Sequence, residues 1–176
     1  IEARRAEWPE LIIETEPKRT YPFGEFAAHA LGYLQPLTPE ELRTAFKDRR
    51  PGDMVGKTGV EAYYENNLTG RDGQIVEVVD SQGRKQDELM NIGPTAGPAL
   101  MLALDYDLQA KAEELLKGKE GAVVVLSPRT GEVLALASFP TFDPNKFINR
   151  FTPEEWTGLI SSPDRPLLNR AVQGLY

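Results

Sequence analysis

The fold of the second half of the chain is decided by the stretch Gly121-Ala-Val-Val-Val-Leu-Ser-Pro-Arg-Thr-Gly-Glu-Val-Leu-Ala-Leu-Ala-Ser138. Two apolar runs, each as long as one strand, flank the turn Pro128–Gly131. The pattern predicts an antiparallel β-hairpin with strands at Gly121–Ser127 and Glu132–Ser138. Because both runs are almost continuously apolar, we expect both faces of the hairpin to be covered.

A helix is predicted directly before this hairpin. Asp105 is a typical N-cap residue, and Gly118 marks the end of the helix. Its apolar face is expected to comprise Leu108, Ala112, Leu115 and Leu116. Met101–Leu104 predicts a short strand ahead of this helix. After the hairpin, the capping-box pattern of Thr152–Glu155 opens a further helix.

The first half of the chain predicts short elements separated by glycine and proline. Strands are expected at Glu10–Thr15 and Gln74–Asp80. Helices are expected at Phe26–Tyr33, at Val60–Leu68, and from the capping box at Thr38 to about Asp48. The polar stretch Lys85–Asn91, followed by Pro94–Pro98, is typical of a linker. The sequence therefore predicts a soluble α+β protein of two lobes, divided into domains at residues 1–93 and 94–176.

The composition excludes several functional classes. The chain has 176 residues, and its formal charge of −7 disfavours a nucleic-acid-binding protein. It has no cysteine and one histidine, which excludes disulfides, thiolate metal sites and a cysteine nucleophile. We expect neither a metal site nor a cofactor. No apolar run approaches the roughly 20 residues that span a bilayer.

The triplet Lys57-Thr58-Gly59 has two tempting interpretations, and both lack support. Penicillin-recognising serine enzymes carry such a triplet, but they also carry S-x-x-K and S-x-N motifs, and no serine of this chain fits either. A P-loop requires glycine five residues before Gly56, and Pro51 stands there. His29 has no neighbouring Ser or Cys in the sequence, so a packed histidine is favoured over a general base.

Three longer blocks together resemble class B penicillin-binding proteins. The first block reads R-x-Y-P-x-G…AH-x-x-GY. The second block reads G-x-x-G-x-E…Y-x-x-x-L-x-G-x-x-G. The third block is the region from Leu104 to Pro140, which resembles the opening of a transpeptidase domain. F-D-P-N and L-N-R-A at 142–145 and 168–171 continue the third block. The resemblance covers about residues 17–176 and favours the elongation-type penicillin-binding protein 2 subfamily. It assigns Lys57-Thr58-Gly59 to a non-catalytic block.

The resemblance implies structural and interaction roles for the residues of the first two blocks. These residues are Arg19, Tyr21, Pro22, Gly24, His29, Gly32, Tyr33, Gly56, Gly59, Glu61, Gly70 and Gly73. By the same resemblance, residues 1–93 form the non-catalytic, dimerisation-type pedestal. Residues 94–176 form the N-terminal part of the transpeptidase domain, ahead of the nucleophile motif. The nucleophilic serine is expected just beyond Tyr176, so no catalytic residue is assigned within the chain.

The family implies a function for the parent protein. Its members crosslink peptidoglycan stem peptides through a serine acyl-enzyme, and β-lactams trap that intermediate. The expected partners are the remainder of the transpeptidase domain, a SEDS-family glycan polymerase and a scaffold of the elongation machinery. Either that remainder is present as another chain, or the second lobe packs on a neighbour. The expected location is extracytoplasmic, with the parent anchored by an N-terminal transmembrane helix. The alternative is a non-catalytic scaffold or wall-binding module.

Overall fold

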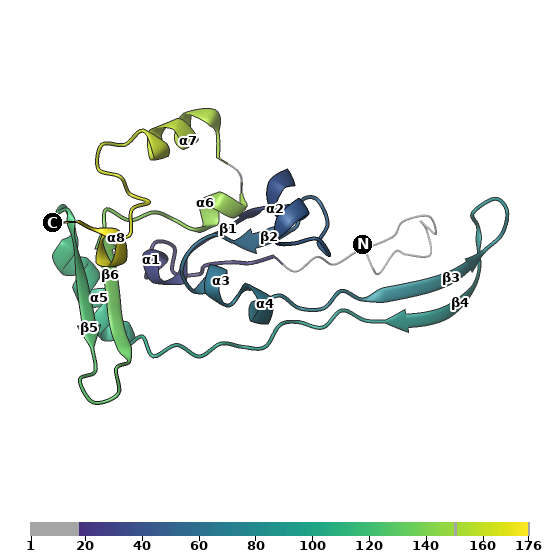
Figure 1. The fold of residues 1–176 in the computed structure, drawn as a ribbon, viewed down its shortest axis with the longest axis horizontal. Helices are drawn as coiled ribbons and strands as arrows, with labels where there is room; N and C mark the ends of the chain where they lie inside the picture. Colours follow the sequence, from purple (N-terminus) through teal and green to yellow (C-terminus); the bar gives the residue numbers. More distant parts are fainter. Residues whose placement is uncertain (1–17, 150, 176) are drawn as a thin grey trace, which may run out of the picture.

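The chain folds into a body with one projecting arm (Figure 1). The computed structural model describes residues 18–149 and 151–175, so the strand predicted at Glu10–Thr15 lies outside the described residues. The first half contains α1 (Ala28–Leu31), β1 (Leu34–Pro36), α2 (Pro39–Thr44), β2 (Met54–Gly56), α3 (Gly59–Tyr63), α4 (Glu65–Leu68), β3 (Gln74–Val79) and β4 (Lys85–Ile92). The second half contains α5 (Tyr106–Leu116), β5 (Gly121–Leu126), β6 (Val133–Phe139), α6 (Asn145–Ile148), α7 (Pro153–Ile160) and α8 (Arg170–Gln173).

The predicted α+β class is confirmed. The strands form three antiparallel pairs, β1 with β2, β3 with β4, and β5 with β6. The β5–β6 pair is the predicted hairpin, with Gly121 opposite Phe139 and Val124 opposite Leu136. Both predicted capping boxes are present, at Thr38 before α2 and at Thr152 before α7.

Helix α5 packs on one face of the β5–β6 hairpin (Figure 1). Ala112 and Leu116 meet Ala135 and Ala137 in a small buried core. Fully buried Gln109 lies on the same side of the helix. Its side-chain oxygen accepts a hydrogen bond from the Leu136 N–H at 2.7 Å, and its Nε2 donates to the Leu136 carbonyl at 3.0 Å. The glutamine therefore binds β6 as a neighbouring strand would.

One expectation for this layer is wrong, and a second is met only in part. Leu108 and Leu115 are 41% and 55% exposed, because the inward face of α5 is built on Gln109, Ala112 and Leu116. The second face of the hairpin is covered only in part within the described residues, because α8 packs on it where Ser138 is buried. Its apolar side chains Val124 and Leu126 are 45% and 56% exposed.

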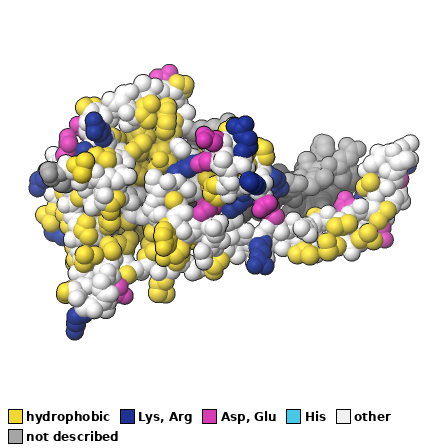
Figure 2. Space-filling model, viewed as in Figure 1, with side chains coloured by type: hydrophobic (Ala, Val, Ile, Leu, Met, Phe, Trp, Pro, Cys, Tyr) yellow, Lys and Arg dark blue, Asp and Glu magenta, His cyan; other side chains and the backbone are white. Residues whose placement is uncertain are grey.

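The arm consists of β3 and β4, and the linker predicted at Lys85–Asn91 is wrong. Ile75 pairs with Asn91 and Val76 with Met90 across the two strands. Every residue of both strands is exposed, so β4 carries no alternation of apolar and polar residues that would identify a strand. Figure 2 shows hydrophobic side chains along the arm, beyond the body of the molecule.

Smaller differences concern the ends of elements. Met101–Leu104 forms no strand, and α2 ends at Thr44 rather than near Asp48. The helix predicted over Val60–Leu68 is divided at Tyr64 into α3 and α4. The helix predicted at Phe26–Tyr33 exists as the single turn α1, and Gly32 ends it as expected.

A second apolar core joins the two halves of the chain. Ala28 of α1 packs with Phe142 and with Phe147 of α6. Tyr33 stacks on Phe147 with 3.9 Å between ring centroids, and Phe151 meets the edge of the same ring. Aromatic residues far apart in the sequence thus connect α1 and β1 to the segment that follows β6.

Candidate functional site: the junction between the two halves

The motif residues of the first two blocks cluster around α1, α3 and the root of the arm. Arg19 and Tyr21 lie in the segment before α1, and Glu61 lies on α3. Tyr21 is 7% exposed and Glu61 is 4% exposed. One oxygen of Glu61 accepts hydrogen bonds from Arg19 Nε at 2.7 Å and from the Tyr21 hydroxyl at 3.1 Å. Burial and the neighbouring carboxylate raise the pKa of Tyr21, so its hydroxyl stays protonated and donates.

Gly32 and Gly59 allow α1 and α3 to touch backbone to backbone. Gly59 has φ of 60°, and a Cβ placed on it would lie 2.6 Å from the Ala30 carbonyl oxygen. Gly32 has φ of 88°, and a Cβ there would collide with the carbonyl of Thr58. Both the left-handed conformation and the close approach require glycine. This contact fixes the position of α3 against α1.

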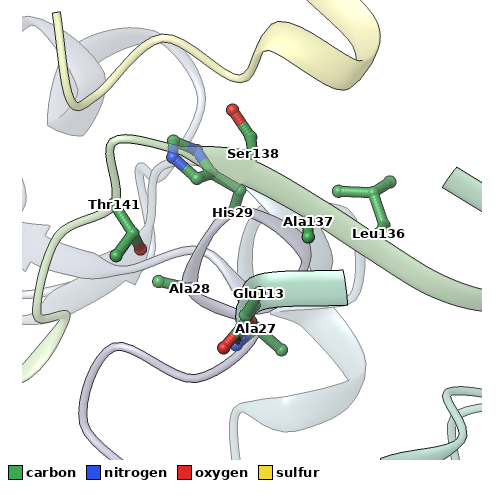
Figure 3. Close-up of a pocket in the computed structure, with 8 residues that line it drawn as sticks. All are labelled: Ala27, Ala28, His29, Glu113, Leu136, Ala137, Ser138 and Thr141. Carbon is green, nitrogen blue, oxygen red and sulfur yellow. Dashed lines mark hydrogen bonds between the residues drawn. The ribbon is translucent and has the colours of Figure 1, made fainter. Parts of the chain in front are cut away.

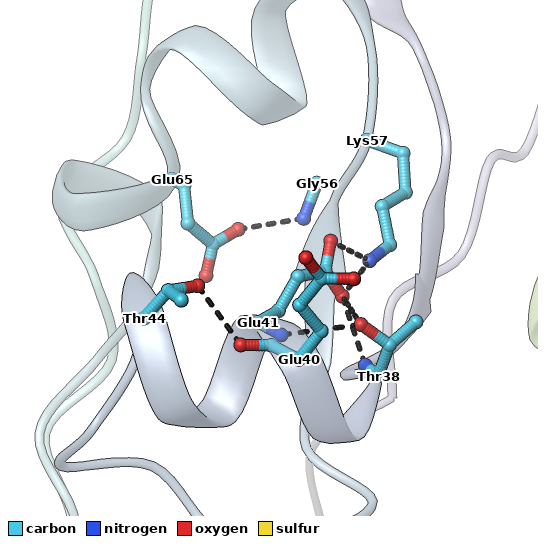
Figure 4. Close-up of polar contacts among 7 residues, drawn as sticks. All are labelled: Thr38, Glu40, Glu41, Thr44, Gly56, Lys57 and Glu65. Atoms are coloured by element: carbon cyan, nitrogen blue, oxygen red, sulfur yellow. Dashed lines mark hydrogen bonds and ion pairs between the residues drawn. The ribbon is translucent and has the colours of Figure 1, made fainter.

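Lys57 and Gly56 form part of a polar cluster in the first half of the chain (Figure 4). Lys57 Nζ donates to Glu41, the carboxylate that also completes the capping box of α2. The Lys57 ammonium and the Thr38 N–H hold the pKa of Glu41 at about 2. On the other side of β2, Glu65 accepts from the Gly56 N–H at 2.8 Å. These contacts are structural, and they engage Lys57 of the Lys57-Thr58-Gly59 triplet within the first half of the chain.

The remaining motif residues lie at turns and at the root of the arm. Pro22 is exposed, Gly24 forms a turn with φ of 59°, and Tyr33 belongs to the aromatic core. Cβ atoms on Gly70 and Gly73 would lie 2.2 Å and 2.6 Å from carbonyl oxygens of the returning chain. The two chain segments therefore run close together where the arm begins.

His29 lies at the junction between α1 and β6 (Figure 3). It is 7% exposed, and its Nε2 is 3.2 Å from the Pro140 carbonyl. Burial lowers its pKa, so the ring is neutral at pH 7. Ser138 lines the same junction, but its hydroxyl donates to the Leu168 carbonyl and accepts from the Arg170 N–H. The two side chains therefore form no acid–base dyad, and the interpretation of His29 as a packed histidine fits this geometry.

Three polar side chains of the second half hold the backbone around α1, a fourth orients one of them, and sequence reasoning assigned none of the four a role. Glu113 accepts from the Ala27 N–H at 2.7 Å, and Asn169 Nδ2 donates to the His29 carbonyl at 3.2 Å. Asn145 binds both backbone groups of Tyr21. Gln109 donates to Glu113 at 2.7 Å and so orients it. The available signal was their presence in the third block: Gln109 and Glu113 lie between Leu104 and Pro140, and Asn145 and Asn169 lie in the F-D-P-N and L-N-R-A strings.

No side-chain cluster suited to a metal ion occurs within residues 18–149 and 151–175. None of the helices in that same region combines the length and the apolar character needed to cross a membrane.

The comparisons with known proteins agree with this arrangement. Residues 1–102 match the model of the penicillin-binding protein dimerisation domain, and residues 121–176 match that of the penicillin-binding protein transpeptidase domain. The peptidoglycan D,D-transpeptidase MrdA of Acinetobacter baumannii is 41% identical over 170 residues, covering 96% of this chain and 25% of that protein. The chain spans about a quarter of the length of the curated relatives it matches.

Solved structures show the same fold. Penicillin-binding protein 2 (PBP2) of Helicobacter pylori, in complex with MreC, superposes with a TM-score of 0.78 and 31% identity over 89% of this chain and 29% of that one. A structure described as a peptidoglycan synthase complex that coordinates polymerization and crosslinking superposes with a TM-score of 0.70 and 34% identity, covering 87% of this chain and 29% of that one. The resemblance expected from the three sequence blocks is confirmed. The chain belongs to the penicillin-binding protein family, with a dimerisation domain followed by the beginning of a transpeptidase domain.

Proposed function

We propose that this chain is the pedestal and the first part of the catalytic domain of a peptidoglycan D,D-transpeptidase that acts in cell elongation. The single observation that carries the proposal is the family match in both halves, with MrdA and PBP2 as relatives. We place the boundary between the pedestal and the catalytic domain at residues 93 and 94. The parent protein is then extracytoplasmic and anchored by an N-terminal transmembrane helix.

The reaction proposed for the parent protein is acyl transfer. A serine Oγ attacks the carbonyl between the two terminal D-alanines of a stem peptide, its proton passes to a base, and D-alanine leaves with a proton restored to its amine. The acyl-enzyme is then attacked by an amine of a neighbouring stem, which releases the serine and forms the crosslink. We place this serine just beyond Tyr176, in an S-x-x-K motif.

The exposed part of the second face of the β5–β6 hairpin supports this proposal. Val124 and Leu126 expose apolar surface on a strand pair whose other face is already covered by α5. Exposed apolar strands of this kind associate with further protein in stable folds. We propose that the remainder of the transpeptidase domain covers them.

The pedestal motifs then have a supporting role. We propose that the twelve residues from Arg19 to Gly73 hold the pedestal against the catalytic domain and expose surfaces for a SEDS-family polymerase and an elongation scaffold. The similar structures of a PBP2–MreC complex and of a peptidoglycan synthase complex support these partner classes.

A fluorescent penicillin tests the proposal on the full-length protein. The gene should encode Ser-x-x-Lys within about ten codons after Tyr176, and the protein should form a covalent penicillin adduct that is lost when that serine is changed to alanine. A protein that carries no such motif and forms no adduct would be a scaffold that kept the family fold without its chemistry.

A further inference from the structure

A cavity of about 340 Å³ lies where the loop before α1 meets the segment from Thr141 to Pro166. Glu25 contributes to its wall from the first half of the chain, and all its other lining residues come from the second half. A volume of this size lies in the range of about 300–1,000 Å³ that is typical of small-molecule sites, which often occur between domains. The proposed transpeptidase chemistry does not use this cavity.

The inner wall of the cavity is aromatic and aliphatic. Phe142 and Phe147 are 5% and 4% exposed and form its fixed base, because both belong to the core that joins the two halves. Phe151 and Leu159 also line the cavity and are half-buried. Phe147 and Phe151 meet edge to face, with 4.8 Å between ring centroids. The wall therefore offers apolar contact and an aromatic surface to a ligand.

The charged groups at the cavity are mainly acidic. Glu25, Asp143 and Glu155 line it together with one cation, Lys146, so these four side chains carry a net charge of −2 at neutral pH. Lys146 Nζ lies 3.6 Å from Glu155, which neutralises one of the three carboxylates. One oxygen of Asp143 accepts hydrogen bonds from Asn145. Among the described residues, none donates a hydrogen bond to the carboxylate of Glu25. Glu25 and the second oxygen of Asp143 thus provide acceptors for a cation.

From this geometry we propose that the cavity binds an organic ammonium ion carrying one aromatic or branched apolar group. The apolar group contacts Phe147, Phe151 and Leu159, and the ammonium faces Glu25 and Asp143. A cation is favoured because the acidic groups exceed the basic one, and an aromatic wall attracts cations further. A bound ligand contacts both halves of the chain and therefore stabilises their junction.

Three probes of the same size and different charge test the proposal on the full-length protein: 3-phenylpropylammonium, 3-phenylpropanol and 3-phenylpropanoate. Titration calorimetry and protein NMR should show that affinity decreases from the ammonium to the alcohol to the carboxylate. The ammonium should bind about tenfold more tightly than the carboxylate. Absence of ammonium binding, or equal affinity for the ammonium and the carboxylate, overturns the proposal.

Matched variants identify the site. Glu25→Gln should weaken ammonium binding about fivefold and leave the affinity for the alcohol unchanged. Glu154→Gln, which alters an exposed carboxylate of α7 outside the cavity lining, should change neither affinity.

Gly158 lines the cavity, and a Cβ placed on it has no atom within 4 Å. A leucine side chain therefore has room at this position, and Gly158→Leu should block the binding of all three probes. Gly158→Ala should retain binding. Unchanged ammonium affinity in both Glu25→Gln and Gly158→Leu overturns the assignment to this cavity.

Discussion

Asn145 binds the backbone of Tyr21 in both directions, although 124 positions separate them in the sequence. Its Oδ1 accepts from the Tyr21 N–H at 2.9 Å, and its Nδ2 donates to the Tyr21 carbonyl at 2.9 Å. The Asp143 carboxylate accepts a further hydrogen bond from Nδ2 and so fixes the orientation of the amide. One side chain thus connects the segment after β6 to the segment before α1.

Replacing this amide should destabilise the protein. Asn145→Ala removes both partners of the Tyr21 backbone, and we expect a loss of about 1–3 kcal/mol in the free energy of unfolding. Urea denaturation measures this loss. Asn149→Ala is the control, because Asn149 contacts only exposed Lys18 through its side chain among the described residues, and it should stay within about 0.5 kcal/mol of wild type. Equal effects of the two changes would contradict the role of Asn145.

Gly24 and Gly59 have the same backbone conformation but different surroundings. Comparing alanine substitutions at the two positions therefore distinguishes backbone strain from steric contact with a neighbouring segment. Gly24 and Gly59 have φ of 59° and 60°, but a Cβ meets nothing within 4 Å at Gly24 and lies 2.6 Å from the Ala30 oxygen at Gly59. Gly24→Ala should cost about 1–2 kcal/mol of stability from the left-handed backbone alone. Gly59→Ala should cost at least about 1 kcal/mol more, because α3 must move away from α1. Thermal or urea unfolding of both variants measures the difference, and equal losses would show that the contact is unimportant.

Tyr21 and Glu61 should be energetically coupled. We expect Tyr21→Phe to cost about 1 kcal/mol in unfolding free energy, because the hydroxyl hydrogen bond to Glu61 is lost. Glu61→Gln should cost more unfolding free energy. The buried carboxylate also accepts a hydrogen bond from Arg19, and the substitution removes its charge. A double-mutant cycle should give a coupling energy of about 0.5–3 kcal/mol. A coupling of zero would mean that the hydroxyl and the carboxylate act independently.

His29 should make stability depend on pH below neutrality. Burial lowers the pKa of the folded state below the ordinary value of 6.5, and the nearby charge of Arg170 lowers it further. The unfolded chain therefore binds a proton first as the pH falls through 6.5, and folding loses stability until the pH is below the lower pKa of the folded state, where the loss levels off. The contribution of His29 is fully present well above pH 6.5, where the ring is neutral in both states.

The variant His29→Gln isolates this contribution. The stability difference between wild type and variant should shrink as the pH decreases from 7.5 to 5. Urea unfolding at several pH values measures this stability difference. Subtracting the stability of the variant from that of the wild type removes the effect of other titrating groups. A difference that stays constant over this range would contradict a depressed pKa for His29.

Features set by neighbouring residues could be predicted from the sequence. Thr38 and Thr152 cap their helices through residues three positions away, and the β5–β6 hairpin follows from two apolar runs around one turn. The family was also predictable, because its blocks are strings of consecutive residues. Strand β4 was not, since both of its faces are exposed and its polar residues carry no period.

The candidate site was predictable only in part. The sequence identified Arg19, Tyr21, His29 and Glu61 as motif residues, but not which groups they bind. Their contacts join residues 40 or more positions apart, and no local periodicity encodes such a pairing.

The sequence by itself therefore determined the local elements and the family, because caps, turns and hydrophobic periods act over a few residues. The tertiary structure alone decided that Gln109 replaces a strand beside β6, that Asn145 and Asn169 hold the backbone around α1, and that a cavity lies between the two halves. Buried backbone groups need partners, and the folded chain supplies them from whichever segment it brings within hydrogen-bond distance.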